Sequence, residues 1–152
     1  MLAAMIRFAY DDESLAAILI VEPPPKEGEW IEYISAIRRM NERVKASRSK
    51  QRPVMLQIMR EGIGMPRAFE RRLIAELRRE IVDHVVNAVA CESAAFRFLG
   101  AAFDWIRKPH YVSRWFRNPP EALTFIEGEL GERSPPLRKL LEDHGVSLRA
   151  PR

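Results

Sequence analysis

Residues 85–130 read VVNAVACESAAFRFLGAAFDWIRKPHYVSRWFRNPPEALTFIEGEL, and they alternate between two kinds of apolar pattern. Residues 85–90 and 111–116 are short runs rich in apolar side chains, which is typical of strands. After Ser93 the apolar residues recur at three- and four-residue intervals, which predicts a helix. An asparagine, two prolines and an acid then form a helix start signal for residues 121–130. This succession of strand, helix, strand and helix favours a parallel sheet.

The earlier part of the chain continues the alternation. Strands are predicted at residues 5–10, 16–21 and 54–59, and helices at residues 29–47 and 66–82. The turn-forming sequence DDES separates the first two strands, so we expect them to form a hairpin. The predicted fold is α/β, with a mixed, mostly parallel five-stranded sheet, an N-terminal β-hairpin and four main helices. We assign residues 1–130 to this domain and residues 131–152 to a linker and a short amphipathic tail.

Composition limits the classes of protein that the chain can belong to. Its 152 residues, of which 47% are hydrophobic, suit one domain. The 25 Lys and Arg residues are interleaved with 21 Asp and Glu, which favours solvated helix faces over a nucleic-acid surface. A single cysteine excludes an internal disulfide, and no apolar run reaches the ~20 residues of a membrane span. With no export leader at the N-terminus, we expect a cytoplasmic protein.

The helix predicted after Ser93 is apolar on two nearly opposite sides. One row, which can face the sheet, contains Phe96, Leu99, Phe103 and Ile106, and the other contains Ala94, Phe98, Ala101 and Trp105. Water against an exposed Phe and Trp is unfavourable, so the second row needs a cover. Either the amphipathic tail folds back over it, or it binds a protein partner, which includes a second copy of the chain in a homodimer. We therefore assign Ala94, Phe98, Ala101 and Trp105 to a candidate partner-binding surface.

The order of elements, with its leading hairpin and four helices, resembles the STAS domain of bacterial anti-sigma-factor antagonists. Residues 85–130 are similar to the second half of its SpoIIAA-like branch, in which a strand ends in Phe and the last helix begins with acid-Ala-Leu and carries an aromatic. Those positions are Phe116, Glu121, Ala122, Leu123 and Phe125 here. The resemblance covers residues 5–130 and implies a non-catalytic regulatory module that acts in signalling by protein–protein interaction.

The STAS resemblance also implies a regulatory loop after residues 54–59. Its residues here are Arg60, Glu61, Gly62, Ile63 and Gly64. The family carries a phosphate-accepting Ser or Thr in this loop, but no hydroxyl side chain lies between residues 52 and 93. No residue of this chain is therefore assigned the family's phosphate-accepting role. The two glycines either allow close approach of a partner or simply permit a tight turn.

Candidates for chemistry are few. The three histidines, His84, His110 and His144, lack the spacing of a metal site, so no metal is expected. Two glycines in the loop are too few for a dinucleotide fingerprint, and we expect no cofactor. An enzyme that uses Cys91 or Glu92 is a third, weaker possibility, because no base lies beside the thiol in the sequence.

A response-regulator receiver is the competing fold, because Asp11 and Asp12 follow the first strand. Receivers need an Asp at the end of the third strand, where this chain has Met59 and Arg60. Asp11 and Asp12 are therefore interpreted as turn residues.

The leading functional prediction is a non-catalytic regulatory interaction module. The alternative is a small-ligand or lipid-binding protein. The SpoIIAA-like branch is also called STAS/SEC14-like, and that resemblance implies an apolar cavity, which we expect in a crevice at the strand ends.

Overall fold

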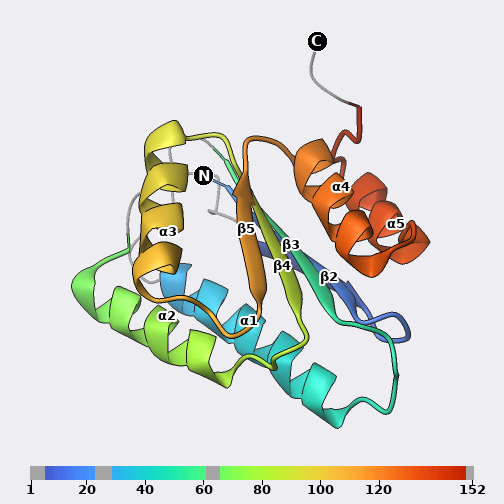
Figure 1. Cartoon of the computed structure of the whole chain (residues 1–152), viewed down its shortest axis with the longest axis horizontal. Helices are drawn as coiled ribbons and strands as arrows, with labels where there is room; N and C mark the ends of the chain where they lie inside the picture. The colour runs from blue at the N-terminus through green and yellow to red at the C-terminus, as the bar shows by residue number, and fades with distance from the viewer. Residues whose placement is uncertain (1–5, 23–28, 61–65, 150–152) are drawn as a thin grey trace.

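In the computed structural model, which describes residues 6–22, 29–60 and 66–149, one five-stranded sheet lies between two layers of helices (Figure 1). The strands are β1 (Ile6–Asp11), β2 (Ala16–Val21), β3 (Val54–Met59), β4 (Val86–Cys91) and β5 (Val112–Phe116). The helices are α1 (Glu29–Ala46), α2 (Ala68–Glu80), α3 (Ala94–Ile106), α4 (Pro119–Leu130) and α5 (Pro135–Asp143). The predicted α/β class, with a mixed and mostly parallel sheet, is confirmed.

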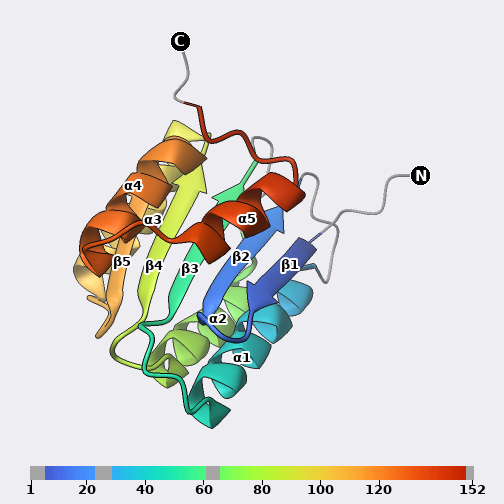
Figure 2. The ribbon, with the colours of Figure 1, turned by 90° about the vertical axis from the view of Figure 1, so that its right-hand side faces the viewer.

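The strands follow one another across the sheet in chain order, from β1 to β5. β1 is antiparallel to β2, as the predicted hairpin requires, and the other neighbours are parallel. Crossovers between parallel strands are right-handed, so three successive crossovers in one direction put α1, α2 and α3 on the same face. Figure 1 shows these helices on one side of the sheet, and Figure 2 shows α4 and α5 on the other.

Side chains of the inner strands alternate between two cores. From β3, Met55 and Met59 face the layer of α1 to α3, whereas Leu56 and Ile58 face the layer of α4 and α5. All six residues of β3 are buried, which accounts for the run, apolar except for Gln57, that predicted the strand. The same explanation holds for β2, whose observed bounds equal the predicted ones.

Helix α5 packs on the sheet, on the face opposite α3. Its Leu137 and Leu141 are fully buried with Ile126 of α4, and α5 contacts β1 and β2. The tail therefore does not cover the second apolar row of α3, and that alternative is wrong. The predicted domain boundary at residue 130 stays a prediction.

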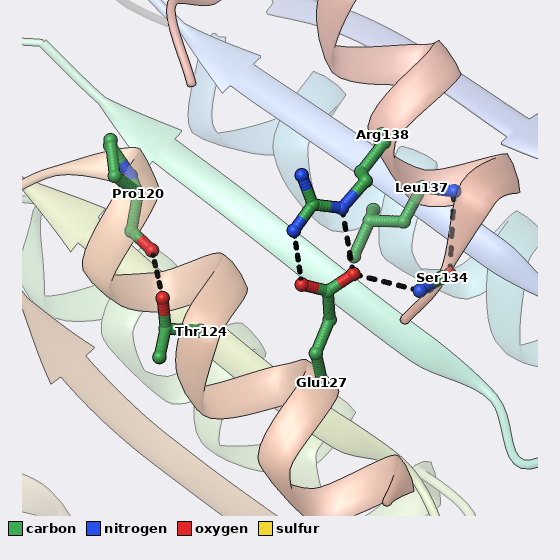
Figure 3. Close-up of polar contacts among 6 residues, drawn as sticks. All are labelled: Pro120, Thr124, Glu127, Ser134, Leu137 and Arg138. Carbon is green, nitrogen blue, oxygen red and sulfur yellow. Dashed lines mark hydrogen bonds and ion pairs between the residues drawn. The ribbon is translucent and has the colours of Figure 1, made fainter. Parts of the chain in front are cut away.

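An ion pair fixes α5 against α4 (Figure 3). Glu127 accepts hydrogen bonds from Arg138, at 2.6 and 2.9 Å, and from the Ser134 backbone N–H at 2.8 Å. The Ser134 hydroxyl in turn caps α5 by accepting from the Leu137 N–H. In α4, the Thr124 hydroxyl donates to the Pro120 carbonyl.

Local signals in the sequence predict some helix ends correctly and some burial wrongly. Ser93 and Asn118 accept hydrogen bonds from the N–H groups three residues on, which are the predicted N-caps. Asp11 accepts from the Ser14 N–H and hydroxyl, as a turn residue does. In α2 the helical spacing of Phe69, Leu73, Leu77 and Ile81 predicts one buried face, which holds for Leu77 but not for Phe69, which is 46% exposed. Phe69 lies in the first turn of the helix, beside the Glu70 carboxylate, which turns inward to accept from the Arg67 N–H.

We expect acid to loosen the contact between α5 and α4. The Arg138 guanidinium, followed by the Ser134 N–H, holds the pKa of the Glu127 carboxyl below its usual value of 4.5. A lowered folded-state pKa adds stability above about pH 4.5, which is lost as the pH falls through the folded pKa. Glu127→Gln should therefore cost about 1–2 kcal/mol of unfolding free energy at pH 7, measured by urea denaturation, and less at pH 3. An equal cost at both pH values would contradict this.

Candidate functional site

Helix α3 occupies an edge of the helical layer. It packs on β4 and β5, and β5 is the edge strand of the sheet, so no other helix of the described residues lies beyond it (Figure 1). None of the residues from Ala94 to Ile106 is fully buried, although the helix is strongly apolar. The site predicted from the sequence therefore belongs to the least covered helix of the described residues.

The outer row of α3 is open to solvent in the isolated chain. Ala94 and Ala101 are exposed, and the side chains of Phe98 and Trp105 are 74% and 87% exposed. The structure thus places all four predicted partner-binding residues on one surface. Their role in binding stays a prediction.

The inner row differs from the sequence prediction. Phe96 and Phe103 are half-buried, but Ile106 is 73% exposed, so the prediction that Ile106 faces the sheet is wrong. Leu99 is 49% exposed and also lines the space beneath the helix. The helix is rotated so that Gly100 and Asp104 face inward instead, and both line the space beneath the helix. Leu99 and Ile106 consequently enlarge the exposed apolar surface of Phe98 and Trp105. We call these four large side chains the α3 outer face.

The Asp104 carboxylate causes this rotation. One oxygen accepts from Arg78 of α2 at 2.6 Å, and the other accepts from the Trp115 indole N–H of β5 at 3.0 Å. The side chains of Arg78 and Asp104 are only 15% and 18% exposed. Burial raises the pKa of the Asp104 carboxyl, although Arg78 and the Trp115 hydrogen bond oppose that rise. A single acid thus ties α3 to a helix and to a strand.

Aromatic rings complete the contact between α3 and the sheet. Phe96 lies nearly parallel to Trp30 of α1, with ring centroids 6.5 Å apart, and 6.1 Å from Trp115. Gly100 lies directly over the Trp115 indole, since a Cβ placed on it would come within 2.3 Å of Trp115 Cζ2. Only a residue without a side chain allows the helix to lie this close to the ring.

A cavity of about 310 Å³ lies beneath α3. α1, α2 and α3 surround it, and its floor consists of side chains from β3, β4 and β5. Its apolar lining contains six aromatic residues, which are Trp30, Tyr33, Phe96, Phe103, Tyr111 and Trp115, and three methionines, which are Met40, Met55 and Met59. The cavity extends under the helix along the sheet, and Met59, the last residue of β3, is part of its lining. Ligand binding at a crevice at the strand ends stays a prediction.

Four polar side chains form a continuous hydrogen-bonded row along one wall and the floor of the cavity. Tyr33 of α1 donates to Gln57 of β3 at 2.6 Å, Gln57 donates to Asn87 of β4 at 2.8 Å, and Asn87 donates to Ser113 of β5 at 3.0 Å. We call this set the amide row. Burial raises the pKa of Tyr33, so its phenol keeps its proton and the row stays uncharged.

The sequence interpretation missed the amide row, although a signal for it existed. Gln57 is the one polar residue of the strand VMLQIM, and Asn87 is the one polar residue of VNAVAC apart from its terminal cysteine. A buried amide needs hydrogen-bond partners, so one amide in each of two adjacent buried strands indicates a pair. Which atoms pair depends on the register, in which Gln57 lies opposite Val89 and Asn87 opposite Met55.

A fifth polar side chain lines the cavity without full hydrogen bonding. Asn41 of α1 is only 6% exposed, and its amide N–H group donates to the Glu80 carbonyl at 2.7 Å. Its side-chain oxygen is buried and accepts no hydrogen bond within the part of the chain that the structure describes. An orphaned buried acceptor costs free energy until a donor reaches it.

Of the predicted regulatory loop at residues 60–64, the structure describes only the first residue, Arg60. Arg60 lies at the carboxyl end of β3, where it pairs with Glu92 at 3.4 Å and its N–H donates to Val21. Glu61, Gly62, Ile63 and Gly64 lie outside the described residues.

The remaining candidates do not converge on a reactive site. Burial raises the pKa of the Cys91 thiol, which disfavours the nucleophilic thiolate. His84, His110 and His144 lie on different segments, and the described residues contain no group of three His, Cys, Asp or Glu side chains that could hold a metal ion. No helix in the described part of the chain is both long enough and apolar enough to cross a bilayer.

We expect Gly100→Ala to destabilise the protein, although alanine is the better helix former. The gain in helix propensity is about 1 kcal/mol, and the new methyl group would overlap the Trp115 indole, which costs about 1–3 kcal/mol through displacement of α3. Urea denaturation should show the loss, and the tryptophan emission, to which Trp115 contributes together with Trp30 and Trp105, should change with it.

Gly128→Ala is the matched control for Gly100→Ala. Gly128 also lies inside a helix, but a Cβ there meets nothing within 4 Å, so this substitution should stabilise the protein by up to about 1 kcal/mol. Equal effects of the two substitutions would show that α3 does not lie against Trp115 in solution.

Comparison of the chain with protein-family models, with curated protein sequences and with solved structures finds no match.

Proposed function

We propose that the protein is a non-catalytic regulatory module with a STAS-like fold, which binds a protein through the α3 outer face. The observation that carries this proposal is the exposure of Phe98, Leu99, Trp105 and Ile106 on one helix. Monomeric proteins rarely leave contiguous large apolar side chains in water unless the surface is used.

The free energy available from covering this face is large. A Phe and a Trp bury roughly 150–250 Å² each, and roughly 25 cal/mol is gained per Å² of apolar surface removed from water. Covering Phe98 and Trp105 alone therefore favours association by several kcal/mol before the entropy cost of binding. The chain's own tail helix is held on the opposite face of the sheet, and no other described segment covers Phe98 or Trp105, which favours a cover from another molecule.

The charges around the α3 outer face indicate the chemistry of the partner. Asp104 is the one acid between Ala94 and Ile106, and it is bound to Arg78 and Trp115 under the helix. Arg107 and Lys108 follow Ile106 directly and are exposed. A partner with an apolar patch bordered by acidic side chains complements this surface.

The order of the elements supports a STAS-like assignment, and with it a role in bacterial signalling. The leading antiparallel hairpin and the alternation of strands and helices agree with the resemblance. The proposal includes no phosphorylation of the loop at 60–64, because no hydroxyl side chain lies there. The cytoplasm is the proposed location, since the one cysteine is buried and free.

The test compares Trp105→Glu with Thr124→Glu. Both substitutions place a carboxylate at an exposed position, the first on the α3 outer face and the second on α4, across the sheet. Tagged wild type and both variants serve as baits in extracts of the source cell. Proteins that bind wild type and Thr124→Glu should bind Trp105→Glu roughly thirtyfold or more weakly, as expected for a central aromatic contact.

Sedimentation velocity of the purified proteins separates a second copy of the chain from a different partner. A dimer that Trp105→Glu dissociates would identify the partner as a second copy. Retention of every bound protein by Trp105→Glu would contradict the proposal. So would a wild-type protein that binds only vesicles of anionic lipid through Trp105, because the face would then serve a membrane surface.

A further inference from the structure

We propose that the cavity beneath α3 binds an uncharged, planar ring compound that carries a carbonyl oxygen. This inference does not depend on the proposed protein binding. The cavity lies against Leu99, Gly100, Phe103 and Asp104 of α3, so Leu99 borders both the cavity and the α3 outer face. Phe98 and Trp105, which are 74% and 87% exposed, do not line the cavity.

The size of the cavity is the first argument. Protein interiors are close-packed and leave few voids larger than one water molecule. A space of about 310 Å³ is many times larger than that, and it reaches the lower end of the range for small-molecule pockets.

The cavity is kept open by contacts at its border. Trp115 holds α3 through Gly100 and Asp104, Phe96 rests on Trp30, and Arg78 of α2 binds Asp104. These contacts set the height of α3 over the sheet, so the helix cannot settle into the space below it. A void supported in this way is typical of a pre-formed ligand site.

The charges of the lining exclude a charged ligand. Arg78 and Asp104 neutralise each other. Arg71, the remaining charged residue of the lining, is exposed to solvent, and its guanidinium donates to the Pro66 carbonyl, so its charge lies at the solvent side of the cavity. The other lining residues are apolar or carry uncharged amide, hydroxyl or phenol groups. A buried charge without a counter-charge is strongly unfavourable, so the ligand is neutral.

The amide row explains the carbonyl oxygen. Gln57 and Asn87 each use their side-chain oxygen and one of their two N–H bonds within the row. Each amide keeps a second N–H for which the described residues offer no acceptor, and both side chains line the cavity floor. A ligand carbonyl would accept from them, and a ligand N–H or O–H would meet the orphaned oxygen of Asn41.

The rings of the lining explain the planar shape. Six aromatic side chains and three methionines line the space, and the rings of Trp30 and Phe96 are within 10° of parallel. Aromatic faces and thioether sulfurs both pack favourably against a flat ring.

The test uses prodan, a neutral naphthalene ketone whose fluorescence rises in an apolar site, as the probe. Two related compounds serve as comparison probes. The first is the same dimethylaminonaphthalene without the ketone, and the second carries a sulfonate in place of the ketone. Calorimetric titration of wild type should give a stoichiometry of one for prodan. Loss of the ketone should weaken binding about fivefold, and the sulfonate should weaken it about tenfold or more.

Val89→Phe and Val86→Phe form a matched pair on β4. Val89 is part of the cavity floor, so Phe there should fill the space, weaken prodan binding about tenfold or more and leave the Tm within about 2 °C of wild type. Val86 is fully buried in the packed core on the opposite face, so Phe there should lower the Tm by roughly 5 °C or more.

Trp105→Glu distinguishes the cavity from the α3 outer face. Prodan binding that survives Trp105→Glu and is lost in Val89→Phe supports the cavity, even if no protein partner exists. Binding that is lost in Trp105→Glu and unchanged in Val89→Phe would overturn the inference. Equal affinity of the wild-type protein for all three probes would also overturn the inference, and so would an absence of prodan binding to the wild-type protein. Both results are measured on wild type alone, so they do not depend on whether a variant folds.

Discussion

Right-handed crossover is the constraint on which the rest of this structure depends. Because β2 to β5 follow chain order, each crossover advances by one strand and puts its helix on the same face. The third of these helices therefore lies over the edge strand β5, with no helix beyond it. α4 and α5 come after the last strand, and they cover the face that the crossovers leave empty. The exposed side of α3 follows from this topology.

Trp115 gives α3 its orientation at that edge. Its ring lies under Gly100 and beside Phe96, and its indole N–H binds Asp104. The helix therefore presents its smallest residue and its one acid to the sheet, although more apolar residues are available. The apolar side chains displaced by this rotation, Leu99 and Ile106, join the α3 outer face. Specific contacts, and not total apolar burial, decide which side of the helix faces inward.

These contacts also show what could and could not be predicted from the sequence. Strands β2 and β3 were predicted to the residue, because a six-residue, mostly apolar run between turn signals is too short for a helix. The second apolar row of α3, with Phe98 and Trp105, was predicted from helical periodicity, whereas its exposure was not, because the tail was an equal candidate to cover it. The rotation of α3 was not, since it depends on Arg78 and Trp115, which come from other elements. The amide row needed the register of β3, β4 and β5, which no local pattern contains.

The two faces of the sheet differ in how completely they are packed, and this difference separates stability from function. On the face of α4 and α5, Ala122, Ile126, Leu137 and Leu141 are fully buried. On the other face, the void beneath α3 and the exposed apolar side chains above it are both unfavourable in an isolated chain. The buried core on the face of α4 and α5 contributes free energy that offsets the cost of this arrangement on the other face. A stable fold that retains a cavity beneath one helix and exposed apolar side chains above it is expected to use these features for binding.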